Sequence, residues 1–180
     1  IRRAGKKIKE EKPEVAETLD NGDADVWKKI LRNPVQATYY LSNSKQELLS
    51  LNDSDVVDFS WVQSYYHLLG FDSVCTDYET GLIFAGNNFN KQHDVCFNSF
   101  FFDEVAGLAV VKQNDLYFTL FGGMHGSSHG HASQGGISLE MNGVHFITHP
   151  GRYSYTECDE RVSFKSEYMQ NSVLVKDGAY

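Results

Sequence analysis

The sequence predicts a mainly β protein in which antiparallel strands follow a helical segment. Aromatic residues make up 13% of the 180 residues, with 12 Phe and 10 Tyr, and this composition favours strands over a helical bundle. Alternating apolar segments joined by short turn signals lie in the second half, whereas helical spacing of apolar residues lies in the first. We therefore divide the chain into a helical or linker segment, residues 1–70, and an antiparallel β region, residues 71–180.

Two helices are predicted before residue 35. Pro13 can open a short helix because the first helical position needs no backbone N–H, and Asn21-Gly22 ends it. Asp23 can cap a second helix. Asn33-Pro34 is expected to end this second helix, because a proline disfavours the helical conformation of the residue before it.

Two further helices are predicted between residue 44 and residue 69. Ser44 followed by Glu47 forms a capping box ahead of a leucine-rich stretch. Residues 55–69 then carry apolar side chains at helical spacing, and the plain interpretation of this stripe is core packing. Its members are Val57, Trp61, Tyr65 and Leu68.

Two hairpins are predicted in the β region. The first joins strands over 108–111 and 116–120 through the turn at residues 113–115. The second joins 137–141 to 144–148 through Asn142-Gly143, which suits a two-residue type I′ turn. Its expected cross-strand pairs are Met141 with Val144, Leu139 with Phe146, and Ile137 with Thr148. A last strand is expected over 173–175.

Five of the seven histidines fall between positions 125 and 149. In the hairpin register just described, the segment before Gly136 and the segment after His149 lie at the same open end. His129, His131 and His149 are therefore expected to gather in space. Imidazoles in such a cluster can bind a divalent metal or transfer protons near neutral pH. The alternative is a solvated Gly/Ser/His turn without function.

Charge and length exclude several classes of protein. Residues 1–12 carry a net +4 and the whole chain −8, which leaves −12 for residues 13–180 and argues against general nucleic-acid binding. No apolar run approaches the ~20 residues of a membrane helix, and no signal-peptide pattern is present. The chain begins with Ile and is interpreted as a fragment or a processed piece. Three cysteines (Cys75, Cys96 and Cys158) without a CxxC pair exclude a thiolate zinc ribbon and leave free thiols or one disulfide open.

Three motifs resemble signatures of the heparinase II/III-like polysaccharide lyases. Residues 129–139 begin His-Gly-His-Ala-Ser and resemble the family's His-Gly-His-Ala-Asp-x-x-Ser-Phe. Residues 149–155, His-Pro-Gly-Arg-Tyr-Ser-Tyr, are similar to Asp-Pro-Gly-x-Tyr-x-Tyr. Residues 169–178 are similar to Ala-His-Asn-Thr-Val-x-Val-Asp-Gly. The motifs occur in the family's order, and the resemblance covers about residues 100–180.

The resemblance implies a larger parent protein. The family joins an N-terminal α/α toroid to a C-terminal antiparallel β-sandwich, so this chain would be the junction and the first part of the β region. The implied substrate is an acidic, uronic-acid-containing polysaccharide, and the implied location is periplasmic or secreted. The toroid, absent from this chain, would be its partner in forming the substrate cleft.

The resemblance also implies a structural zinc site with altered ligands. By position, His129 would face the substrate, while His131, His149 and Gln170 would occupy the metal positions. The family has Asp where His149 stands and His where Gln170 stands, and Ser133 replaces the Asp of its first motif. Neutral His can replace a carboxylate on zinc, but Gln is a poor zinc ligand. The expected outcomes are weak metal binding, another metal, or a site held by hydrogen bonds alone.

The family's reaction is β-elimination at a uronic acid. A base removes the C5 proton, the charge that develops on the neighbouring carboxylate must be neutralised, and the leaving oxygen at C4 needs a proton. His129 is the candidate neutraliser, and Tyr153 and Tyr155 are candidate proton carriers. Arg152 and Arg161 could hold a substrate carboxylate through bidentate contacts. Ordinary strand packing and surface exposure remain the plain alternatives for these tyrosines and arginines.

Two functions therefore remain open from the sequence. The first is the β part of such a lyase, which we expect to be inactive without its toroid. The second is a non-catalytic carbohydrate-binding or structural β-module that has diverged from the family. The order of the motifs favours family membership in both cases, whereas the changes at residues 133, 149 and 170 and the charge of −12 favour divergence.

Overall fold

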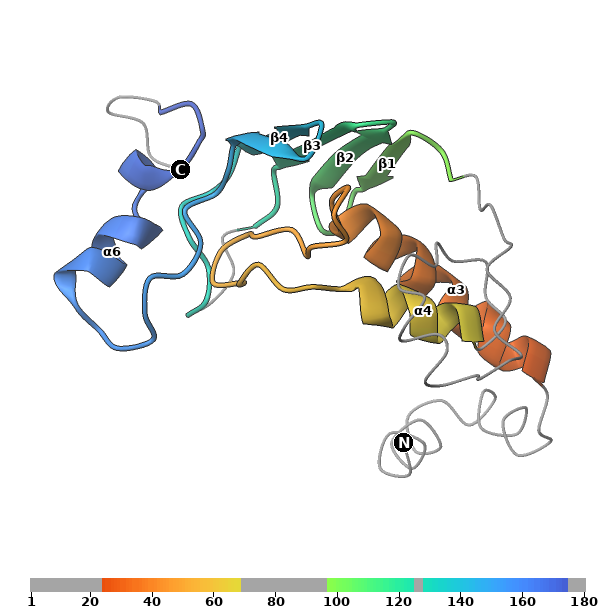
Figure 1. The fold of residues 1–180 in the computed structure, drawn as a ribbon. Helices are drawn as coiled ribbons and strands as arrows, with labels where there is room; N and C mark the ends of the chain where they lie inside the picture. The colour runs from red at the N-terminus through yellow and green to blue at the C-terminus, as the bar shows by residue number, and fades with distance from the viewer. Residues whose placement is uncertain (1–23, 69–96, 125–127, 175–180) are drawn as a thin grey trace.

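The computed structural model describes residues 24–68, 97–124 and 128–174, and its central element is a five-stranded antiparallel sheet (Figure 1). The strands follow one another in space in chain order, from β1 to β5. They are β1 (Phe100–Asp103), β2 (Leu108–Gln113), β3 (Leu116–Phe121), β4 (Gly136–Met141) and β5 (Val144–Ile147). The expected mainly β, antiparallel fold is confirmed.

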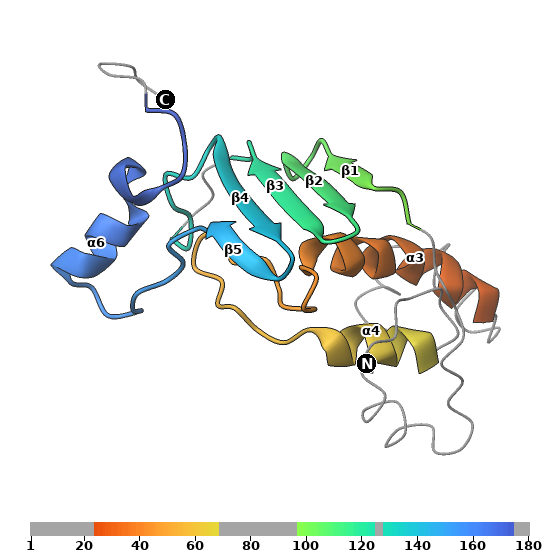
Figure 2. The ribbon, with the colours of Figure 1, turned by 45° about the horizontal axis from the view of Figure 1, so that its top comes forward.

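Helices precede and follow the strands in the sequence. The described ones are α3 (Ala24–Leu41), α4 (Ser60–Leu68), α6 (Asp159–Lys165) and the 3₁₀ helix η2 (Glu167–Met169). Helices α3 and α4 lie beneath one face of the sheet, and α6 lies beyond its end (Figures 1 and 2). No helix in the described part of the chain is long and apolar enough to span a membrane.

Both predicted hairpin turns are present. Gln113 pairs with Leu116, so Asn114 and Asp115 form the turn between β2 and β3. Between β4 and β5, Asn142 and Gly143 have φ of 51° and 70°, the left-handed conformation that a type I′ turn requires at both central positions.

The register of the second hairpin differs from the prediction after two pairs. Met141 pairs with Val144 as expected, and Glu140 pairs with His145, but Leu139 then pairs with Ile147. The expected pairing of Leu139 with Phe146 is therefore wrong. The irregularity between residues 139 and 140 places one extra residue in β5, as a β-bulge does. Strand β5 ends at Ile147, so the expected partner of Ile137, Thr148, lies outside it.

The predicted helix after Ser44 is also wrong, because Asn43 competes with it. The side-chain oxygen of Asn43 accepts hydrogen bonds from the backbone N–H groups of Lys45 and Glu47, each at 2.9 Å. Such local bonds offer the backbone an alternative to a helix. Gln46 has a φ of 63°, which no right-handed helix contains. Residues 42–59 instead form an irregular segment that we call the α3–α4 loop.

The boundaries of α3 and α4 also differ from expectation. Helix α3 continues through Pro34 to Leu41, so the expected stop at Asn33-Pro34 is wrong. Tertiary packing overrides the local cost of the proline, because the last turn of α3 inserts Tyr40 into the core. Helix α4 begins only at Ser60, whose backbone N–H donates to Asp58. The short helix expected after Pro13 lies outside the described residues.

The end of the chain is more helical than the sequence analysis proposed. Helix α6 lies inside the region assigned to strands, and its sequence carries the appropriate signal. Asp159 and Glu160 stand in the first turn and Lys165 in the last, which complements the helix dipole. Val173 and Leu174 belong to no strand, contrary to prediction, and Val175 lies outside the described residues.

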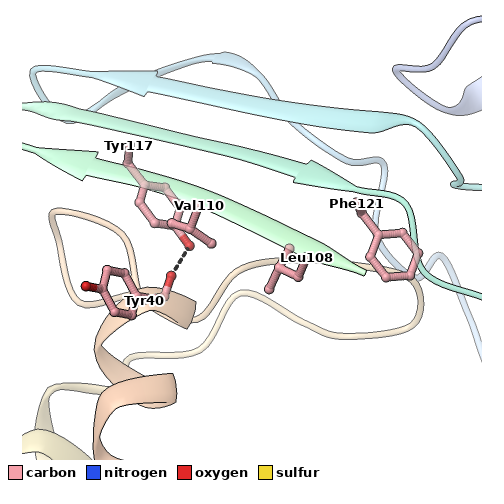
Figure 3. Packing of buried hydrophobic residues seen from close by; sticks show 5 residues of the cluster. All are labelled: Tyr40, Leu108, Val110, Tyr117 and Phe121. Carbon is pink, nitrogen blue, oxygen red and sulfur yellow. Dashed lines mark hydrogen bonds between the residues drawn. The ribbon is translucent and has the colours of Figure 1, made fainter. Parts of the chain in front are cut away.

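The core lies between α3 and the sheet (Figure 3). Tyr40 is fully buried, and its ring stacks on that of Phe101 with 4.6 Å between the ring centroids. The Tyr117 hydroxyl donates to the backbone carbonyl of Tyr40 at 2.9 Å, so the sheet satisfies a carbonyl at the end of the helix. The buried cluster consists of Tyr40, Leu108, Val110, Tyr117 and Phe121.

The opposite face of the sheet is apolar and exposed. Phe146 is 64% exposed, and five further large apolar side chains on the sheet are at least 41% exposed. These are Phe100, Phe102, Leu120, Met141 and Val144. The described residues thus form a sheet with one covered face and one open apolar face.

Lys112 ties the sheet to the end of α3. Its ammonium group donates to the backbone carbonyls of Tyr39 at 2.8 Å and Ser42 at 2.7 Å, and it lies 4.0 Å from the centre of the Tyr39 ring. Burial lowers the pKa of Lys112 to about 8, and the negative charge of Glu140 opposes this shift.

The lowered pKa of Lys112 predicts that stability rises with pH between about 8 and 10.5. In this window the unfolded chain, whose lysine keeps its ordinary pKa, binds more protons than the folded chain. The contribution is complete above the unfolded pKa and is lost as pH falls through 8. Urea unfolding at several pH values should show a slope of at most about 1.4 kcal/mol per pH unit from this group. Lys112→Met should remove that slope, and an identical slope in the variant would contradict the assignment.

Candidate functional site

Three segments that are far apart in sequence meet where β4 begins. They are the α3–α4 loop, residues 128–136, which we call the histidine loop, and residues 149–161, which lead into α6. The α3–α4 loop runs beyond both helices toward the histidine loop (Figure 2). The contact is direct, because the side-chain oxygen of Asn52 accepts from the backbone N–H of His131 at 3.2 Å and from the Ser133 hydroxyl at 2.8 Å.

Asp53 is the centre of this meeting point. Its side chain is only 4% exposed, and both carboxylate oxygens accept hydrogen bonds. One oxygen accepts from His129 Nδ1 at 2.9 Å, and the other accepts from His131 Nε2 at 2.8 Å. The Arg161 guanidinium contacts both oxygens, at 2.9 and 3.3 Å. One buried carboxylate therefore joins two histidines and an arginine.

The Asp53 carboxylate is held in its ionised form. Burial alone would raise its pKa, but the hydrogen bonds from Arg161, His131 and His129, together with the positive charge of Arg161, outweigh burial and hold the pKa well below its usual range. The carboxylate correspondingly raises the pKa of Arg161. Arg161 is itself buried and also donates to the Ser154 carbonyl, so it is committed to the interior.

The three predicted metal positions are all buried in this region. Neither ring nitrogen of His149 makes a hydrogen bond of normal geometry within the described ranges, and the same holds for His131 Nδ1. Burial lowers the pKa of His149, the neighbouring His131 lowers it further, and the side chain of Gln170, close enough for a weak hydrogen bond, raises it. Across the described residues, no three His, Cys, Asp or Glu side chains gather as a metal site. The arrangement is two imidazoles and the amide of Gln170.

Gly136 makes room for the His149 ring. A Cβ atom at this position would lie 2.8 Å from His149 Cε1 and 2.7 Å from the Ser133 carbonyl oxygen. Glycine is therefore required at the first residue of β4 for His149 to pack above it. The expected proximity of residues 136 and 149 at the open end of the hairpin is thus present despite the bulge in β5.

A second group of predicted site residues lies on the surface beside Asp53. The His129 side chain is 67% exposed and meets the Tyr155 ring edge-on, with 5.9 Å between centroids. The Arg152 guanidinium lies 4.0 Å from the centre of the Tyr155 ring and pairs with Asp55 through two of its nitrogens. Tyr153 is not part of this group, because its ring packs against Phe164.

The remaining histidines of the sequence cluster do not join this site. His145 lies between two other carboxylates, 3.5 Å from Glu140 and 3.7 Å from Glu47. Together these three residues line a small cavity beneath β4 and β5. His125 lies outside the described residues. The spatial cluster therefore consists of His129, His131 and His149, as the hairpin argument expected.

Sequence reasoning missed the contribution of the α3–α4 loop. Asn52, Asp53 and Asp55 hold the histidine loop and Arg152 from a position more than 70 residues earlier in the chain. The only local signal is the polar run Asn52-Asp53-Ser54-Asp55, which is typical of any exposed turn. The sequence analysis proposed that Arg161 binds substrate. In the structure its side chain is buried against Asp53 and does not reach the surface where a substrate would bind.

The geometry defines a β domain with a histidine-rich site at one end of its sheet, and comparison with known proteins relates this part of the chain to one family. Residues 98–179 match the family model described as "Heparinase II/III-like, C-terminal". Residues 98–179 of this chain are therefore similar to the C-terminal region of heparinase II/III-like proteins. A sequence search of curated proteins finds no match.

Solved structures share the fold. A mutant of heparan sulfate lyase HepC from Pedobacter heparinus superposes with a TM-score of 0.60 at 16% identity, over 76% of this chain and 22% of the lyase chain. A heparinase III structure gives a TM-score of 0.59 at 17% identity, over 77% of this chain and 25% of that one. The chain thus spans about a quarter or less of the enzymes that it resembles, and at such identities the likeness establishes the fold alone.

The two arginines of the site should differ strongly in their effect on stability. Arg161→Met leaves the Asp53 carboxylate buried without its main counter-charge, which is costly. Arg152→Met breaks an exposed pair with Asp55, and such pairs contribute little. In urea unfolding, the first variant should lower the midpoint several times more than the second. Equal midpoints would show that Arg161 does not neutralise Asp53 in the folded chain.

Proposed function

We propose that this chain is the β-sheet part of a polysaccharide lyase that acts by β-elimination on a uronic-acid-containing polysaccharide. The observation that supports this most is the exposed imidazole of His129, which occupies the substrate-facing position of the family's His-x-His motif. Its Nδ1 is engaged by Asp53, so its Nε2 is the nitrogen available to a ligand. The structures it resembles include proteins named heparan sulfate lyase and heparinase III.

The chemistry assigns separate roles to the surface residues. His129 would neutralise the substrate carboxylate while the C5 proton is removed, which is where negative charge develops. Tyr155 is the better of the two candidate proton carriers, because its ring is adjacent to His129 whereas that of Tyr153 packs against Phe164. Arg152, stacked on Tyr155, would contribute a positive charge to the same surface.

The rest of the cleft would come from outside this chain. We propose that an α/α toroid in a parent protein forms the opposite wall, and that a second sheet of the β-sandwich covers the open apolar face. Without the opposite wall, the substrate is not fixed against His129, and orientation can supply ~7–11 kcal/mol of barrier reduction. The chain alone is therefore expected to be inactive. A periplasmic or secreted location would fit an enzyme that acts on extracellular polysaccharide.

We further propose a structural zinc ion held by His131, His149 and Gln170. The fit rests on the buried nitrogens of the two histidines, which make no hydrogen bond of normal geometry in the described structure. Buried polar groups are rarely left without partners, so a ligand is the natural occupant. The Gln170 NH₂ group donates to the Phe164 carbonyl at 2.9 Å, which leaves its amide oxygen as the group that could ligate. When bound, the metal would tie the histidine loop to residues 149 and 170.

The lyase function predicts a specific loss of activity in the parent protein. His129→Ala should reduce turnover roughly 100-fold or more, because it removes a preorganised group that stabilises developing charge. Tyr155→Phe should reduce turnover further than Tyr153→Phe. The assay is the ultraviolet absorbance of the product's C4–C5 double bond, which is conjugated to its carboxylate.

The control for this prediction is His145→Ala, which removes a histidine of the same sequence cluster that contacts Glu47 and Glu140 and not Asp53. Full activity in the His129 variant would show that this residue does not face the substrate. Binding of heparan sulfate by an unaltered parent that produces no absorbance would favour the non-catalytic carbohydrate-binding module. Cleavage by the isolated 180 residues would overturn the requirement for a second domain.

The metal proposal predicts that the unaltered chain binds zinc and becomes more resistant to thermal unfolding, since a ligand that binds only the folded state stabilises it. His149→Ala should abolish the thermal shift, whereas His145→Ala should retain it. Zinc content after mild chelation gives the second measurement. A chain that retains no zinc and shows no thermal shift would leave only the hydrogen-bonded form of the site.

A further inference from the structure

We infer that Asp53 is a positioning residue that sets the protonated nitrogen of both His129 and His131, and so couples the substrate-facing imidazole to the buried one. The inference rests on the proposed function for the meaning of the two histidines, but its geometric basis is independent of it. Asp53 lies in the α3–α4 loop, outside every motif that the sequence analysis identified and outside the 98–179 family match.

The first step is the state of the carboxylate. Asp53 is buried and paired with the buried guanidinium of Arg161 through both oxygens, an arrangement that requires the ionised form. An ionised carboxylate only accepts hydrogen bonds. The two imidazole nitrogens that contact it, His129 Nδ1 and His131 Nε2, must therefore both carry protons.

The second step is what this leaves free on each ring. In neutral His129 the lone pair must lie on Nε2, which is the nitrogen not engaged by Asp53. In neutral His131 the lone pair must lie on Nδ1, which is buried and has no hydrogen-bond partner in the described part of the chain. A histidine that donates one N–H to a carboxylate and presents the other nitrogen to a buried space is the usual arrangement of a metal ligand. One oxygen of Asp53 thus directs the lone pair of His129 toward the surface, and the other directs the lone pair of His131 toward the buried space.

The third step is specificity for a carboxylate. Four N–H groups point at Asp53, two on each oxygen, and the nearest described acidic residue in sequence, Asp55, pairs instead with Arg152. An asparagine at position 53 has the same shape but offers one acceptor oxygen. Whichever way its amide is turned, its NH₂ group faces an imidazole N–H, and that histidine must move its proton to the other nitrogen or turn away.

The test is nitrogen NMR of histidine-labelled chain at about pH 9, well above the ordinary imidazole pKa of about 6.5. In the unaltered chain, the ring nitrogens should show His129 protonated on Nδ1 and His131 protonated on Nε2. Asp53→Asn should change the tautomer of at least one of them, while the matched control Asp55→Asn should change neither. The tautomer change counts as positioning only while the remaining histidine signals of the variant, such as those of His145, stay as they are in the unaltered chain, because a general loss of the fold would shift them together.

A second readout is zinc affinity measured by competition with a coloured chelator. Asp53→Asn should weaken zinc binding roughly 10–100-fold, the usual effect of losing such a supporting carboxylate, and Asp55→Asn should not. If His129 and His131 of the unaltered chain each show the expected tautomer but the chain binds no zinc, the metal proposal fails and the positioning role of Asp53 stands. His129 protonated on Nε2 in the unaltered chain would overturn the inference, and this measurement needs no variant to fold. Asp53→Asn with both tautomers unchanged would overturn it equally.

Discussion

The structure of the site depends on one buried ion pair, between Asp53 of the α3–α4 loop and Arg161 of α6. Charges are costly to bury, and this pair is tolerated because each carboxylate oxygen also accepts an imidazole N–H and the guanidinium also reaches a backbone carbonyl. Removing either partner would leave the other charged and buried. The pair therefore fixes where the histidine loop and the segment before α6 lie relative to each other.

A second constraint holds the α3–α4 loop against the sheet. Tyr117 and Lys112, both on the inner face, donate to carbonyls at the end of α3, and Tyr40 of the same helix completes the core. Asn43 and Ser44 then bind the buried carboxylate of Glu140 in β4. The loop is thereby anchored at its start by the sheet and can present Asp53 to the histidine loop. Core packing and site geometry are linked through this one segment.

These contacts show how the residues that differ from the heparinase II/III-like motifs are accommodated in the structure. In the first motif, Ser133 takes the place of the family's Asp, and it bonds to Asn52 in the buried part of the site. In the second, His149 stands in place of an Asp and packs over Gly136, where a side chain would not fit. The changed residues are therefore integrated into the structure, Ser133 through a hydrogen bond and His149 through packing.

Local sequence determined the elements whose signals act over a few residues. The turn residues Asn114, Asn142 and Gly143 fixed two hairpins because their backbone conformations are available to few other residues, and the resulting hairpin brought His131 and His149 to one end. Tertiary structure decided the rest. It carried α3 through Pro34, replaced a capping-box helix by a loop, and inserted a bulge that moved Leu139 from Phe146 to Ile147. It also determined the role of Asp53, which no local pattern encodes. This aspartate acquires its main partner only when the fold brings Arg161, more than 100 residues later in the sequence, against it.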